Sequence, residues 1–73
     1  MSTGFKRPDD LAEEVVRLRL PQKTDARLQT LMEQNNEGRL SAAELQELES
    51  LVEMSETISL LRAKALKFLG RKP

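Results

Sequence analysis

The sequence predicts an all-α protein with three helices: a short helix, then a helical hairpin whose C-terminal helix is long. Apolar residues recur at helical spacing in three separate segments. Pro21 and Gly38 separate these segments, and no proline or glycine interrupts the chain between Gly38 and Gly70. The 73 residues make at most one small domain. We therefore expect a flexible N-terminal tail over 1–8, a single helical domain over 9–69 and a C-terminal tail over 70–73.

The first helix is expected to begin at Asp9 and Asp10 and to end before Pro21. Asp10 and Glu13 have the spacing of a capping box, and acidic residues suit the positive end of a helix. The residue before a proline avoids helical geometry, so the proline should end this segment. One apolar face follows helical spacing here, formed by Leu11, Val15 and Leu18.

A strand is the alternative structure for the end of this segment. Val16, Leu18 and Leu20 alternate with arginines, which is the pattern of a half-buried strand. We favour the helix, because the residues at its start are typical of a helix N-terminus. The strand would matter for function, since paired strands can carry arginines into a groove of DNA.

The second helix is expected to start between Pro21 and Thr24 and to run to about Asn35. Thr24 is a suitable N-cap, with Asp25 behind it in the first turn. The apolar face of this helix is formed by Leu28, Leu31 and Met32. Gly38 can take the left-handed conformation that commonly ends a helix, so a tight turn should follow.

The third helix has the clearest start in the chain. Ser41 and Glu44 have the spacing of a capping box, and Leu40 and Leu45 have that of a hydrophobic staple. We expect the helix to run from Ala42 to Leu69. At 1.5 Å per residue it would be about 40 Å long.

Apolar residues along the third helix repeat at spacings of three and four, the pattern by which helices pack on partner helices. The two shorter helices together barely match its length, so much of its C-terminal half depends on other contacts. Either the first helix folds across this half, or the half is an interface, which we favour. The predicted partner-binding residues are Leu51, Met54, Ile58, Leu61, Arg62, Lys64, Ala65 and Phe68.

Charge is segregated along the third helix, although the formal net charge of the chain is +0. Glutamates fill its first half, and lysines and arginines fill its second half. The helix dipole favours this arrangement. The arrangement would also let two copies pair antiparallel, or let the basic end contact phosphate. Nucleic-acid binding has weak support, because the chain carries no overall positive charge and Phe68 is the one aromatic residue nearby.

Composition argues against catalysis and against metal binding. The sequence contains no cysteine and no histidine, so neither can serve as nucleophile, general base or metal ligand. We therefore predict no catalytic, cofactor-binding or metal-binding residues. No apolar run approaches the roughly 20 residues of a membrane span, and the N-terminal residues are unlike a signal peptide. A cytoplasmic location is the expectation.

Four blocks stand out between Leu11 and Leu69: LAEEVVRLRLP, ARLQTLMEQNNEG, RLSAAELQELESLVE and SLLRAKALKFL. With these blocks the chain resembles a group of small, poorly characterised bacterial helical proteins. Three features carry the resemblance: Arg19-Leu20-Pro21 after the first helix, the turn Gly38-Arg39-Leu40-Ser41, and Lys64-Ala65 late in the chain. Leu66 stands where an arginine often follows the Lys-Ala pair in that group. Similar proteins look like antitoxin partners of nuclease-type toxins. The resemblance implies a protein that neutralises a toxin by laying its long helix on it.

The patterns predict a non-catalytic regulatory protein that docks its C-terminal helix on a partner protein, and the resemblance implies that this protein is antitoxin-like. The expected partner is another protein, for which the resemblance implies a toxin or nuclease, or a second copy of the chain, and no membrane is expected. Two alternatives stay open. One is a homo-oligomeric helical protein whose heptads pair with each other, and the other is a ribbon-helix-helix-like DNA-binding repressor.

Overall fold

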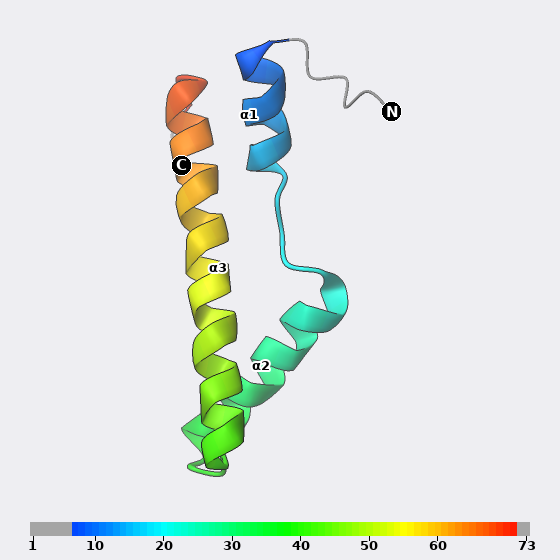
Figure 1. Cartoon of the computed structure of the whole chain (residues 1–73), viewed down its shortest axis with the longest axis vertical. Coiled ribbons are helices and arrows are strands. Elements are labelled where there is room, and N and C mark those ends of the chain that lie inside the picture. Colours follow the sequence, from blue (N-terminus) through cyan, green and yellow to red (C-terminus); the bar gives the residue numbers. More distant parts are fainter. Residues whose placement is uncertain (1–6, 72–73) are drawn as a thin grey trace. The chain divides into compact units, whose positions relative to one another are not determined.

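The computed structural model of the protein describes residues 7–71, and within them it contains three helices and no strand (Figure 1). The helices are α1 (Pro8–Val16), α2 (Gln22–Asn36) and α3 (Ala42–Phe68). The predicted all-α fold, a short helix followed by a helical hairpin, is confirmed. Of the predicted tails over 1–8 and 70–73, residues 1–6 and 72–73 lie outside the described part. The described remainder differs from a tail, because Pro8 begins α1 and Gly70 and Arg71 belong to the hydrogen-bonded turn that ends α3.

The contacts of the chain group into two compact units. The hairpin unit is Leu20–Thr57, which contains α2 and the first part of α3. The terminal unit combines Met1–Arg19 with Ile58–Pro73, and so joins α1 to the last part of α3. The single domain over 9–69 stays a prediction.

The start of α1 differs from the expected one. Arg7, with an extended backbone, is the N-cap, and Pro8 is the first helical residue. Proline suits that place, because its fixed φ matches the helix and its missing N–H is not needed there. Asp10 already donates its backbone N–H to the carbonyl oxygen of Arg7, 3.0 Å away. The predicted capping box of Asp10 and Glu13 is therefore wrong.

The end of α1 also differs, since the helix stops at Val16 instead of continuing toward Pro21. Residues 18–20 form neither helix nor strand, so the strand alternative is not observed either. The carbonyl oxygen of Val16 accepts hydrogen bonds from Nη1 of Arg19, at 3.0 Å, and from Nε of Arg62, at 3.2 Å. These arginines satisfy a backbone group that a longer helix would have used internally.

Two local motifs build the hairpin. Gly38 has a φ of 68°, its N–H bonds to the carbonyl of Asn35, and the N–H of Arg39 bonds to that of Gln34. This is the Schellman arrangement that ends a helix. The predicted capping box then starts α3: the Ser41 N–H bonds to Glu44 Oε1 at 3.0 Å, and the Glu44 N–H bonds to Ser41 Oγ at 3.2 Å.

The hairpin unit has a small leucine core. Leu28, Leu31 and Leu48 are buried, with Leu31 fully inaccessible. Residues packed against these three are Leu20, Leu40, Leu51 and Val52. The N-cap of α2 is Pro21, which makes no side-chain cap, and Thr24 lies inside the helix, so the predicted N-cap at Thr24 is wrong. Of the expected staple, Leu40 packs on the core, whereas Leu45 is 42% exposed.

The C-terminal end of α3 repeats the motif that ends α2. The helix stops at Phe68, one residue before the expected end, and Gly70 has a φ of 75°. The N–H of Gly70 bonds to the carbonyl of Lys67, and that of Arg71 bonds to the carbonyl of Leu66. The turn fixes the backbone of Arg71, whose side chain reaches α1.

Candidate protein-binding groove

Two arginines of the terminal unit tie α1 to the last part of α3. Arg71 donates two hydrogen bonds to the carboxylate of Glu13, at 3.0 and 2.6 Å. Arg62, which is partly buried, donates Nε to the carbonyl oxygen of Val16. The hydrogen bond from Arg71 lowers the pKa of the Glu13 carboxyl below its ordinary value of 4.5. The pair is exposed, so it orients α1 more than it stabilises the fold.

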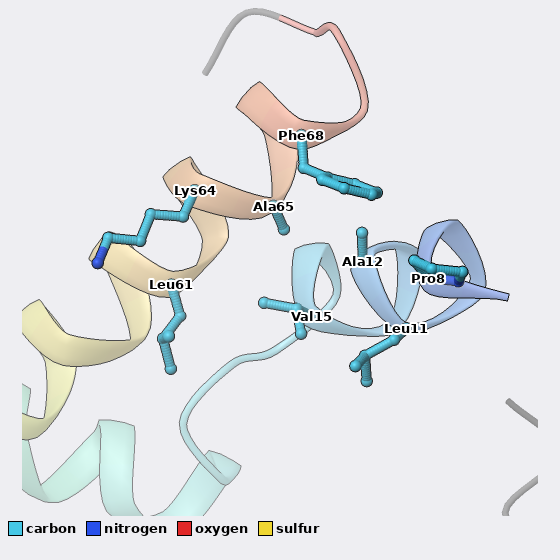
Figure 2. A pocket seen from close by; sticks show the side chains of 8 residues that line it. All are labelled: Pro8, Leu11, Ala12, Val15, Leu61, Lys64, Ala65 and Phe68. Carbon is cyan, nitrogen blue, oxygen red and sulfur yellow. The ribbon is translucent and has the colours of Figure 1, made fainter.

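Between these two helices lies a groove of about 350 Å³. Figure 2 shows the side chains that line it, half of them from α1 and half from α3. Seven of the eight are apolar or prolyl side chains, and the eighth is a lysine. The lining residues are Pro8, Leu11, Ala12, Val15, Leu61, Lys64, Ala65 and Phe68.

The groove buries its small residues and exposes its large ones. Ala12 and Ala65 are 8% and 7% exposed, and they are the buried residues of the terminal unit in the described part of the chain. Leu11, Leu61 and Phe68, by contrast, are 48%, 43% and 63% exposed. An ordinary core buries its large apolar side chains first, because they lose the most apolar surface to water. Leu11, Leu61 and Phe68 therefore form an exposed apolar rim around the two buried alanines.

Lys64 borders the groove without entering it. Figure 2 shows its side chain running along α3 and its Nζ pointing away from α1. Among residues 7–71 the Lys64 ammonium makes no hydrogen bond and no ion pair. Its methylene groups thus extend the apolar surface while the charge remains in water, as is usual for lysine at such an edge.

The structure divides the predicted heptad residues of α3 into two rows. Leu51 and Ile58 are half-buried and Ala65 is buried, so this row is already used within the chain. The other row stays exposed: Met54, Leu61 and Phe68. Among the basic residues predicted beside them, Arg62 is engaged with α1, whereas Lys64 is exposed.

The site predicted from the sequence contains no residue of α1, although α1 supplies half of the residues that line the groove. The periodic spacing of Leu11 and Val15 marked them as one helical face, but it did not show which surface they would meet. Pro8 and Ala12 gave no signal, because neither a helix-starting proline nor a single alanine is specific to binding. The first helix does lie on the last part of α3, yet it leaves the large side chains exposed.

Two other kinds of feature, a metal-binding group and a membrane span, can be assessed for the described residues. No group of three or more acidic side chains is placed to hold a metal ion within residues 7–71. No helix in this part of the chain is long and apolar enough to cross a membrane. Comparison with protein-family models, with curated proteins and with solved structures finds no match.

Proposed function

We propose that this protein is a non-catalytic regulatory protein that binds another protein through the groove between α1 and α3. The proposal rests on one observation about the groove: its small alanine side chains are buried, whereas the large side chains of Leu11, Leu61 and Phe68 are exposed. A partner that covers this rim would complete the burial that the chain alone leaves unfinished. Large exposed apolar side chains gathered at one place are typical of interaction surfaces.

The energy available from the rim is adequate for a specific contact. Fully burying a leucine or phenylalanine side chain is worth roughly 1.5–3 kcal/mol. Because Leu11, Leu61 and Phe68 are each about half exposed, a partner could gain roughly 1 kcal/mol from each by covering it. An amphipathic helix laid along the groove would reach all three side chains at once.

An antitoxin role fits this kind of surface, and the resemblance of the sequence to antitoxin-type proteins favours it. Such a protein would neutralise a nuclease-type toxin by occupying its surface, without chemistry of its own. The sequence lacks histidine and cysteine, which supports a binding function over a catalytic one. The ribbon-helix-helix alternative has no support from residues 16–20, which form no strand.

The test is capture of the tagged full chain from its native host, followed by native mass spectrometry of the complex. Leu61→Asp places a charge on the rim and should abolish the complex. Met32→Asp is the matched control, because Met32 is also 43% exposed but lies on α2, which contributes no residue to the lining of the groove. Circular dichroism of both variants checks that helix content is retained.

One foreign protein, bound stoichiometrically to the natural chain and to Met32→Asp but lost from Leu61→Asp, would support the proposal. Growth arrest by that protein alone, relieved by co-expression of this chain, would establish the antitoxin role. Capture that is equal for both variants would show that binding uses another surface. Unfolding of Leu61→Asp alone would show that the rim belongs to the core.

A further inference from the structure

The outward face of α3 carries a charge pattern that the contacts of the chain do not use. Helical spacing places on this face a set of residues that are all exposed: Glu53, Glu56, Leu60, Lys64 and Lys67. The buried α3 residues Leu48 and Ala65 lie on the opposite side of the same helix. Within residues 7–71, the four charged side chains of the outward face form no ion pair.

Neighbours along this face carry the same charge, which is unfavourable within a single helix. Glu53 and Glu56 are three residues apart, and so are Lys64 and Lys67. Like charges at this spacing repel, whereas a glutamate four residues before a lysine would attract. The helix dipole accounts for Lys67 in the last turn, but Glu53 and Glu56 lie well beyond the first turn, where its effect has faded.

The charge of the side chains along this face changes from negative to positive at one residue. Leu60, which is 56% exposed, lies at its centre. Glu56 and Lys64 each lie four residues from Leu60, on opposite sides, and Glu53 and Lys67 each lie seven residues from it. Rotating α3 by half a turn about an axis that passes through Leu60, perpendicular to the helix, therefore exchanges Glu56 with Lys64 and Glu53 with Lys67.

We propose that a second copy of this chain packs antiparallel on the outward face of α3, with a two-fold axis beside Leu60. The two Leu60 side chains meet at the axis. Glu56 then faces Lys64 of the second copy, Glu53 faces its Lys67, and the symmetry repeats both pairs. A parallel arrangement would place glutamate against glutamate, so the charges select the antiparallel one.

This pairing uses a different face of α3 from the groove and shares only Lys64 with the groove lining. The Nζ of Lys64 points away from α1, so pairing with a carboxylate of a second copy leaves the apolar rim open (Figure 2). One leucine per copy and a few exposed ion pairs make a weak contact. The association should therefore be concentration-dependent and should weaken as salt screens the charges.

Cross-linking through Leu60→Cys tests the position of the axis. The sequence has no cysteine, so a single introduced thiol is the one site that can form a disulfide. Ser50→Cys is the matched control: it is also exposed on α3, but its two copies would lie roughly 30 Å apart in the antiparallel pair. We expect covalent dimer from Leu60→Cys to form at least about tenfold faster. Equal rates for the two variants would overturn the proposed axis.

Charge exchange tests the pairing itself, by sedimentation equilibrium of the full chain at low and high salt. The natural chain should show a mass that rises with concentration at low salt. Glu53→Lys should raise the dimer Kd about tenfold, because lysine then faces Lys67. The double variant E53K/K67E should return the Kd to within about threefold of the natural value. A strict monomer at millimolar concentration, or a double variant as weak as the single one, would overturn the proposal.

Discussion

Arg62 and Val16 join α3 to the end of α1: Nε of Arg62 donates to the carbonyl oxygen of Val16 across 3.2 Å. That carbonyl is one of the groups at a helix C-terminus that lack a partner within the helix. The last turn of α1 contains no basic residue of its own. The third helix thus supplies, together with Arg19, a cation of the kind that ordinarily stabilises the negative end of a helix dipole.

Replacing Arg62 with methionine should lower the free energy of unfolding by about 1 kcal/mol, the usual worth of one such hydrogen bond. Arg19 also donates to the Val16 carbonyl, so the loss is partial. Urea denaturation followed by circular dichroism measures the change. Lys23→Met, at an exposed lysine of α2, is the control and should change stability little. Equal stability of both variants would show that the contact with Val16 contributes nothing.

Ser41→Ala should destabilise the protein by about 1 kcal/mol, because it removes the oxygen that caps the N–H of Glu44 at the start of α3. Ser50→Ala changes the same residue type at an exposed position inside α3, where alanine is a better helix former. It should leave stability unchanged or slightly raised. Thermal unfolding of the two variants measures the difference. A loss of stability in Ser50→Ala as large as in Ser41→Ala would contradict the capping role.

Stability should be constant above about pH 5 and should fall as the pH drops through the acidic range. Hydrogen bonds from Arg71, Ser41 and Arg27 lower the pKa values of Glu13, Glu44 and Glu47 below 4.5. A carboxyl whose pKa is lower in the folded state contributes stability above its unfolded pKa, and this is lost as pH falls through the folded pKa.

The melting temperature between pH 3 and pH 7 tests this dependence. The three substitutions Glu13→Gln, Glu44→Gln and Glu47→Gln, made together, should flatten the acid branch of the profile. Glu49→Gln serves as the control, since Glu49 forms no ion pair within residues 7–71. A profile of the triple variant as steep as that of the natural chain would show that other groups cause the acid loss.

Substitutions at Leu31 and Phe68 should affect different properties: the first should lower stability, and the second should weaken binding of the partner. Leu31 is 0% exposed in the core of the hairpin unit, so Leu31→Ala should cost about 2–5 kcal/mol and could unfold a chain this small. Phe68 is 63% exposed, so Phe68→Ala should cost well under 1 kcal/mol while weakening capture of the partner. Urea denaturation and the capture experiment measure the two effects. A large loss of stability in Phe68→Ala would place Phe68 in the fold and not in the interface.

The sequence by itself determined the helical fold and the turn between α2 and α3. The capping box of Ser41 and Glu44 and the left-handed Gly38 depend on hydrogen bonds between residues a few positions apart. Such contacts are encoded locally, so spacing is enough to predict them. The bounds of α1 were predicted less well, because Pro8 starts the helix early and the end of the helix is bonded by Arg62, a residue distant in sequence.

Only the tertiary structure decided which apolar residues of α3 remain exposed. Periodicity placed Leu61, Ala65 and Phe68 on one helical face, but it treated them as equivalent. The packing of α1 buries Ala65 and leaves Leu61 and Phe68 at the rim of the groove. Helical spacing states which side chains share a face, whereas the covering of that face depends on contacts between distant segments, which spacing does not encode.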